Sequence, residues 1–487
     1  MGQGDRLRAG EQPLTGAILP ELADPDHPGR PTVAEIEALF GRERLWQTYL
    51  EIEATLASVQ AELGIIPACA AVEIRRKATL EAIDVGALAA DIDRTRAPIV
   101  SVVRALARAC EGGAGAYVHW GATTQNLTQT GRTLLMREAH QALMRLLGDI
   151  LGRLAALAES GARMLMVGRT NHRHALPITF GLKVAAWIEE LLRHVDRLQG
   201  AEPRVFVSLW GGALGAMHAF GEHGPEINRR LSARLGLAPL AVPSRAGTDH
   251  VAEYVLLLAL LGSTFSKIAR ELYALMADEV GEVSEAQGDE VVGSSTMPQK
   301  INSKVAVQVI ALAGRLRAQV PLALEAMQPT HEGDAANNQM MYWLMEGTPP
   351  LAYAVAWEMD RLLDCLRLHP QRMRRNLDRS GESIAAERVM MLLAPHLGRG
   401  EAHDLVHHAL SEASASGASI LPTLLADERV RGSVEEHALR ASLDPAAYTG
   451  HSEPMAREMA AAARSAATRL QAPATARGPA SHDPGRP

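Results

Sequence analysis

Aromatic residues and cysteines are both scarce in this chain of 487 residues. Phe, Trp and Tyr together make up 4% of it, and there are three cysteines. Cys69, Cys110 and Cys365 lie far apart, form no C-x-x-C pair and are odd in number. They indicate reduced thiols in a cytosolic protein.

The chain also lacks a net positive charge and long hydrophobic runs. The formal net charge of -7 argues against nucleic acid or an anionic membrane as a partner. The most apolar run, YVLLLALLG from Tyr254, is too short to span a bilayer. The first residues, MGQGDRLRAG, lack the apolar segment of a secretion signal, and Arg6 stands where a myristoylation motif needs Ser or Thr. We therefore expect a soluble, cytoplasmic protein.

What the chain does contain is helical periodicity. Hydrophobic residues make up 47% of it and recur at alternating spacings of four and three. One such seam comprises Leu45, Tyr49, Ile52, Leu56, Val59 and Leu63, and a second comprises Val184, Ile188, Leu191, Val195 and Leu198. Because alternating strand patterns are scarce, the sequence predicts an all-α protein built on long bundled helices.

Two further segments predict central helices. The span 251–285 is long, apolar and almost free of helix breakers, and another helix is expected from Ser303, kinked at Pro321. Such continuous apolar faces favour oligomerisation. Both chain ends, about 1–30 and 471–487, mix Gly, Pro and polar residues without apolar periodicity and are expected to be loose.

Polar residues gather in three regions outside these seams. The first region, HWGATTQNLTQT (residues 119–130), offers hydroxyls and amides at the start of a helix, where an anion binds well. The alternative is that Thr123 or Thr124 simply caps that helix. The second region, GRTNHRHALPITFG (residues 168–181), crowds two arginines and two histidines before Pro177. Its alternative is a solvated basic loop.

The third region, GSSTMPQKIN, spans residues 293–302. It is not a phosphate-binding loop, because that motif needs a second Gly directly before Lys300 and a Ser or Thr directly after it, and neither is present. The Ser-x-x-Lys spacing of a β-lactamase-like nucleophile is absent too. His403, His407 and Glu401 lie close together in sequence, as metal ligands can, but no H-E-x-x-H motif is present, and we expect exposed helix histidines.

Taken together, the three regions resemble the signature regions of the fumarase/aspartase superfamily. The third region matches the family pattern G-S-S-x-M-P-x-K-x-N at every fixed position. The likeness runs from Phe40 to His408, and NLDRSGESIAAERVMMLLAP, from Asn376, resembles the branch of adenylosuccinate lyase and 3-carboxy-cis,cis-muconate cycloisomerase. The resemblance implies a three-domain, all-α fold with a long central bundle. The expected divisions are 1–30, 31–117, 118–368, 369–470 and 471–487.

The same resemblance implies a homotetramer in which three subunits build each active site. The family chemistry is β-elimination from a succinyl group to give fumarate, with no cofactor and no metal. By resemblance Ser294 is the base, with Ser295 as a weaker candidate, and Lys300 and Asn302 hold the carboxylate whose charge builds up. The implied substrate-binding set is Thr123, Thr124, Asn126, Arg169, Thr170, Asn171, His172, Arg173, His174, Arg245, Ser295 and Met297. The loop is expected to close over the substrate.

Several positions depart from the family pattern. Asn171 stands where relatives have His, Arg173 where they have Gln, and Ser303 where they have Pro. Thr248 stands where relatives have Arg, whereas Arg245 appears three residues earlier. An amine leaving group needs a general acid, but a stable anion does not. The departures therefore favour an anionic leaving group and are similar to those of lyases that release nitrite from nitrosuccinate.

Three alternatives remain open. The first is a lactonising enzyme of the 3-carboxymuconate type, and the second is another C–N lyase of the adenylosuccinate lyase family. The third is a noncatalytic scaffold with the same fold, against which the intact set of Ser294, Lys300 and Asn302 argues.

Overall fold

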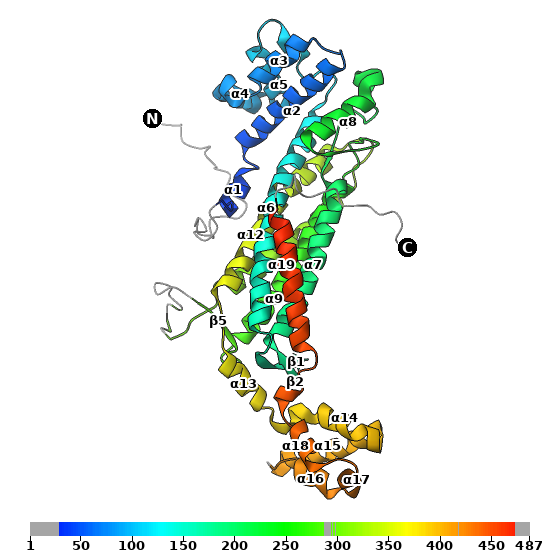
Figure 1. Cartoon of the computed structure of the whole chain (residues 1–487). Helices are drawn as coiled ribbons and strands as arrows, with labels where there is room; N and C mark the ends of the chain where they lie inside the picture. The colour runs from blue at the N-terminus through cyan, green and yellow to red at the C-terminus, as the bar shows by residue number, and fades with distance from the viewer. Residues whose placement is uncertain (1–28, 287–293, 295, 298, 417, 473–487) are drawn as a thin grey trace.

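A long helical bundle forms the centre of the molecule, and a smaller helical group lies at each end (Figure 1). The computed structural model describes residues 29–286, 294, 296–297, 299–416 and 418–472. The bundle helices are α6 (Thr124–Ser160), α7 (Phe180–Val205), α9 (Asp249–Leu275), α10 (Val305–Arg317), α11 (Gln319–Ala326), α12 (Ala335–Cys365) and α19 (Ser452–Gln471). The all-α fold predicted from the sequence is confirmed.

The N-terminal group surrounds the predicted seam of α2. It comprises α1 (Val33–Ala38), α2 (Arg42–Glu62), α3 (Ala68–Lys77), α4 (Val85–Thr95), α5 (Pro98–Ala109) and the 3-10 helices η1 (Leu80–Ala82) and η2 (Ala114–Tyr117). All seam residues of α2 from Leu45 to Val59 are buried, and so are all five of α7. The helix η3 (His218–His223) and α8 (Gly224–Leu235) add Phe220, Ile227 and Leu231 to the same core as α2.

The C-terminal group has a core of its own. It comprises α13 (Pro370–Asp378), α14 (Ala386–Leu397), α15 (Arg399–Ser416), α16 (Leu421–Ala426), α17 (Glu428–Arg431), α18 (Glu436–Ser442), η4 (Gly381–Ala385) and η5 (Pro445–Ala447). The last helix, α19, returns to the bundle and packs along α6 and α7 through Ala460, Ala463 and Ala466 (Figure 1). The C-terminal domain expected over 369–470 therefore divides before Ser452.

The described strands form three two-stranded sheets. The antiparallel pairs are β1 (Leu165–Thr170) with β2 (Arg173–Thr179) and β5 (Val283–Glu285) with β6 (Leu366–Leu368); β3 (Val207–Ser208) and β4 (Ala238–Pro239) are parallel. The predicted helix over 251–285 was too long. Helix α9 ends at Leu275, because residues 283–285 pair with β6 as strand β5, and the chain between them turns through Gly281, whose φ is +60°.

The helix expected from Ser303 is also interrupted. α10 ends at Arg317 and α11 begins at Gln319. Pro321 has no N–H to bond to the carbonyl of Arg317, which explains why the helix breaks there. Of the expected N-terminal tail, Arg30 is described and is held in place: its guanidinium pairs with Asp149 at 2.6 Å and Asp360 at 2.7 Å.

Two described helical stretches have the length and hydropathy of a membrane span, α9 and the run from Val305 to Ala326. Within its most apolar window, α9 is 67% buried inside the bundle, as the core helix of a soluble protein is. The second run is 28% buried over the same kind of window, so much of its apolar surface is not covered by the described residues of one chain.

Candidate active site

The first polar region turns sharply before α6 begins. His119 and Gly121 have positive φ angles of 64° and 76°, and a Cβ on Gly121 would lie 2.7 Å from the ring of Phe220, so glycine is required there. The carboxylate of Glu53, 1% exposed, accepts the backbone N–H of His119 at 2.9 Å and pairs with its Nδ1 at 2.6 Å. A buried carboxylate thus fixes both the turn and the imidazole.

The start of α6 separates the predicted binding residues by exposure. Asn126 is fully buried, and its amide is used internally: Oδ1 accepts from the N–H of Thr123 at 2.9 Å and Nδ2 donates to the carbonyl of Leu209 at 2.8 Å. Thr123 is the N-cap of α6, so this contact supports the capping alternative raised for Thr123. Thr124, the first residue of α6, is exposed beside the helix N-terminus. Substrate contacts at Thr123, Thr124 and Asn126 remain predictions.

Arg245 joins this first region. Its Nε donates to Oε1 of Gln125 at 2.6 Å, and its Nη1 donates to the carbonyl of Ala213 at 2.9 Å. The amides of Gln125 and Asn338 face each other, with hydrogen bonds of 3.1 and 3.2 Å. Thr248, by contrast, is 5% exposed and donates to the carbonyl of Ala326. Where relatives have Arg, Thr248 carries no charge, so Arg245 is the nearby cation in this chain.

The second polar region is a β-hairpin. Asn171 and His172 have φ angles of 50° and 61° and connect β1 to β2, with Thr170 opposite Arg173. Two consecutive residues with positive φ form the type I′ turn that suits a two-residue hairpin, and Asn is favoured there. The tip residues Thr170, Asn171, His172, Arg173 and His174 are all exposed.

Arg169 sits at the base of this hairpin and already has a carboxylate partner. Its guanidinium forms a bidentate pair with Glu282, at 2.7 and 2.9 Å, and Glu282 is 0% exposed. Asn376 of α13 also donates to Glu282, at 2.8 Å. The pair ties the hairpin to the strand β5 and the C-terminal group, so the structure gives Arg169 an internal role, and substrate binding by it remains a prediction.

His174 ties the hairpin to the C-terminal group at a second point. Its Nδ1 lies 2.6 Å from Oγ of Ser380. Partial desolvation at this contact and then the positive charge of Arg169 lower the pKa of His174 below its ordinary value, although the residue as a whole is exposed. These two effects favour the neutral imidazole at this contact.

The third polar region presents the predicted base. The Oγ of Ser294 accepts the backbone N–H of Thr296 at 3.3 Å and that of Met297 at 3.1 Å. Met297, Lys300 and Asn302 are exposed, and Ser295 lies outside the described residues. Two N–H groups on one oxygen supply the kind of support that a serine alkoxide needs.

One chain keeps the first and second regions apart. α6 has 37 residues, which corresponds to about 55 Å, with Thr123 before its start and the hairpin just after its end (Figure 1). The third region follows β5, and Glu282 links this part of the chain to the hairpin. A site built from the first and second regions therefore needs more than one chain.

Sequence reasoning assigned no role to His119, Glu53, Gln125 or Asn338. His119 and Gln125 lie inside the first region, so the motif itself was a signal for them. Glu53 follows the seam residue Ile52, and a carboxylate beside an apolar seam is another usable signal. Asn338 is separated from Gln125 by 213 residues, and nothing local indicates their contact.

A metal site finds no support in the described part of the chain. No group of three or more His, Cys, Asp and Glu residues there could hold an ion. Glu401 pairs with Arg429, His403 contacts Asp404, and the rings of His403 and His407 stack. His403 and His407 are exposed on the surface of α15, as expected from the sequence.

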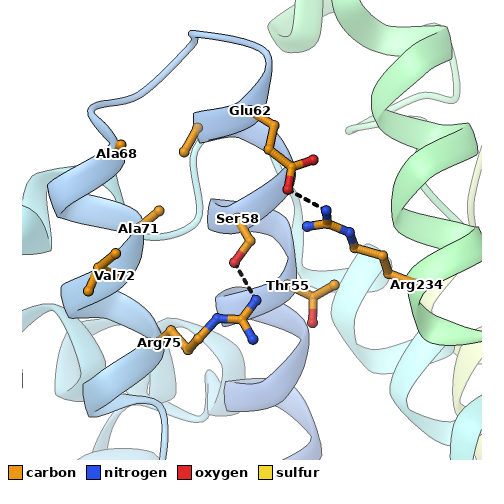
Figure 2. A pocket seen from close by; sticks show the side chains of 9 residues that line it. Thr55, Ser58, Glu62, Ala68, Ala71, Val72, Arg75 and Arg234 are labelled. Atoms are coloured by element: carbon orange, nitrogen blue, oxygen red, sulfur yellow. Dashed lines mark hydrogen bonds and ion pairs between the residues drawn. The ribbon is translucent and has the colours of Figure 1, made fainter.

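A pocket of about 600 Å³ lies among α2, α3 and Arg234 of α8 (Figure 2). Its two arginines already have partners: Arg75 donates to Ser58 at 2.7 Å, and Arg234 pairs with Glu62. None of the predicted site residues lines this pocket. It is therefore separate from the three polar regions.

The fold agrees with comparisons to known proteins. Residues 42–316 match the family described as Lyase, and residues 382–459 match Adenylosuccinate lyase C-terminus. Adenylosuccinate lyase of Methanothermobacter thermautotrophicus is 36% identical over 86% of this chain and 94% of its own length. Trans-aconitate decarboxylase 1 of Mycosarcoma maydis is 34% identical over 91% and 90%.

A solved structure agrees as well. The 3-carboxy-cis,cis-muconate lactonizing enzyme of Pseudomonas putida superimposes with a TM-score of 0.78, at 31% identity, over 90% of this chain and 97% of that one. The chain belongs to the fumarase/aspartase superfamily of lyases, in the branch of adenylosuccinate lyase and the carboxymuconate enzymes. The resemblance predicted from the three regions is confirmed.

Proposed function

We propose that this protein eliminates nitrite from nitrosuccinate to give fumarate. Ser294 Oγ, as the alkoxide, takes a proton from the carbon beside a carboxylate. The electron pair of that C–H bond forms the carbon–carbon double bond, and the C–N bond breaks as nitrite leaves. The observation that carries the proposal is the pair of backbone N–H groups on Ser294 Oγ. They stabilise the charged oxygen without needing a neighbouring histidine.

The leaving group is inferred from the tip of the hairpin. Asn171 occupies the position where related lyases carry His, and its positive φ fits the two-residue turn. Asn cannot donate a proton as a general acid, and an amine leaves poorly without one. Nitrite leaves as a stable anion, so its expulsion does not require that acid.

Binding of the substrate anions is assigned to the first region and to the hairpin. Arg245 is anchored by Gln125 beside the N-terminus of α6, where the helix dipole adds positive potential. A planar nitro group and a carboxylate both match the guanidinium fork. Arg173 on the exposed hairpin tip adds a second cation for the other end of the substrate.

The site is proposed to form between subunits of a homotetramer. The length of α6 keeps the first region and the hairpin of one chain apart, so they must come from different chains. Several large apolar side chains on the bundle helices, or directly after one of them, are exposed in one chain, and contact with other subunits would bury them. They are Leu260, Tyr273, Val307, Leu324, Met327 and Trp343. A helical assembly that buries them would bring the three regions together.

Purified protein and nitrosuccinate test the reaction directly. We expect equal amounts of nitrite, measured by diazo coupling, and fumarate, measured by its ultraviolet absorbance. Ser294→Ala should lower kcat by at least about a hundredfold, because it removes the base. Absence of both products with the wild-type protein would falsify the proposal, and an unchanged Ser294→Ala turnover would reassign the base.

The alternative function is lactonisation of a 3-carboxymuconate. It is favoured by the likeness to the lactonizing enzyme of Pseudomonas putida. It requires the same handling of a proton beside a carboxylate, but no C–N bond breaks. Lactone formation from 3-carboxymuconate, with no nitrite from nitrosuccinate, would select it.

A further inference from the structure

Glu285 lies where the chain leaves β5 and enters the segment that contains the third region. Glu285 is the last residue of β5, is 9% exposed, and lies opposite Leu366 in the strand ladder. The next residue, Ala286, donates its backbone N–H to the carbonyl of Cys365 at 2.6 Å. The backbone that carries this carboxylate is therefore fixed on both sides.

Glu285 caps α10 from outside that helix. Its Oε1 accepts Ser303 Oγ at 2.6 Å and Ala306 N–H at 2.9 Å, and its Oε2 accepts the N–H groups of Lys304 and Val305 at 2.7 and 3.1 Å. Lys304, at the N-cap position, makes no side-chain cap. Four donors thus occupy both oxygens, at the helix end that favours negative charge.

This contact joins Glu285 to Ser303, the two residues that flank the segment containing the third region. The chain leaves β5 just after Glu285 and enters α10 just after Ser303, with Ser294, Lys300 and Asn302 between them. Asn302 directly precedes Ser303, so the position of Ser303 limits where the Asn302 side chain can lie. A shift of about 1 Å in such a group is enough to lower turnover.

We propose that Glu285 and Ser303 are positioning residues that hold Lys300 and Asn302 where charge builds up on the substrate. The roles of Lys300 and Asn302 rest on the proposed function. The contact of Glu285 with Ser303 and the first N–H groups of α10, which we call the clamp, rests on the four hydrogen bonds. Ser303 stands where relatives have Pro, and Pro has no hydroxyl to donate. In this chain the hydroxyl gives the clamp its side-chain hydrogen bond.

Substitutions at the two positions separate the clamp from general stability. Glu285→Gln keeps the shape but replaces one acceptor oxygen by a donor, so it loses two of the four bonds. We expect kcat to fall at least about tenfold, with KM changed less than about twofold. Ser303→Ala should lower kcat about threefold to tenfold, and Ser303→Thr, which keeps the hydroxyl, should restore it to within about twofold.

The matched control is another Glu that caps a helix. Glu35 accepts the N–H and hydroxyl of Thr32 at the start of α1, at 2.7 and 3.0 Å. Glu35→Gln should leave kcat unchanged. If Glu285→Gln does not fold, the comparison of Ser303→Ala with Ser303→Thr still decides. Wild-type kcat in Ser303→Ala, or a loss that Thr does not restore, overturns the proposal.

Hydrogen exchange supplies a measurement that does not depend on the substrate. The backbone amides of Lys304, Val305 and Ala306 should exchange at least about tenfold faster in Glu285→Gln, because their acceptor is weakened. Unchanged exchange overturns the clamp. If the wild-type protein turns over none of the substituted succinates, the proposed function fails, and the exchange of these amides still tests the clamp.

Discussion

The two ends of α6 carry polar regions that differ in composition and in packing. At its start, Gln125 of α6 forms a connected network with Arg245 and Asn338, which come from separate parts of the chain. Just after its end, the hairpin tip is exposed, and Arg169 at its base is already neutralised by Glu282. The first region is organised within one chain, whereas the hairpin tip is exposed in that chain.

This difference teaches how to read a polar motif. A polar group whose hydrogen bonds are made inside the chain indicates a role inside the fold, as for the buried Asn126 and for Arg169, whose partner Glu282 is buried. An exposed cation next to such a group, as with Arg173, costs little stability to keep and is free to serve a ligand or a partner chain. Motif membership alone does not separate these two cases.

The sharpest way to break the comparison is to remove one cation from each end. Arg245→Ala and Arg173→Ala should each lower kcat/KM by about a hundredfold, because each removes a charged partner of the substrate. If the two ends meet only between chains, coexpression of the two variants should raise activity at least about tenfold over either alone. Assays of the purified mixed oligomers measure this recovery.

A chain that carries both substitutions is the control for this experiment. It should show no recovery, because none of its copies has either cation. Failure of the two single variants to complement each other would mean that Arg245 and Arg173 act within the same chain.

Stability should distinguish the two arginines of the second region. Arg169→Ala leaves the buried Glu282 carboxylate without its cation and should cost about 3 kcal/mol of unfolding free energy. Arg173→Ala, at the exposed tip, should change it by less than about 0.5 kcal/mol. Urea unfolding at a fixed protein concentration measures both. Equal midpoints for the two variants would contradict the internal role of Arg169.

The start of α6 offers a smaller contrast of the same kind. Asn126→Ala removes an amide that bonds at both ends and should cost about 1 to 2 kcal/mol. Thr124→Ala should leave stability within about 0.5 kcal/mol but lower kcat/KM by about tenfold. Thermal unfolding and fumarate release from the same preparations give the two quantities. The assignment fails if Asn126→Ala is as stable as the wild-type protein.

Much of the fold could be predicted because its helices are long and their apolar faces are regular. The seams of α2 and α7 are buried as their spacing predicted. The end of α9 could not be placed this way, because β5 is defined by pairing with β6, which lies far along the chain. The return of α19 to the bundle is likewise a tertiary contact, and its small alanine face carries little local signal.

Part of the candidate site could likewise be predicted from local sequence, and part depends on long-range contacts. The third region could be identified from its own residues, since Ser294, Lys300 and Asn302 lie within one short motif. The partner of Arg245 is 120 residues away, and that of His119 is 66 residues away, so neither could be inferred from spacing. Local sequence indicates the chemistry, whereas long-range packing determines which side chains remain available for it.

The smallest expected effect concerns the anchoring of the hairpin through His174. Its pKa lies below the ordinary value of 6.5, because of partial desolvation and then the charge of Arg169, while Glu282 acts in the opposite direction. The unfolded chain therefore binds the proton more readily, and the free energy of unfolding should fall as the pH drops below about 6.5. In His174→Gln, urea midpoints measured from about pH 7 to about pH 5 should depend less on pH. The same dependence in both proteins would show that the contact between His174 and Ser380 does not anchor the hairpin by holding a neutral imidazole.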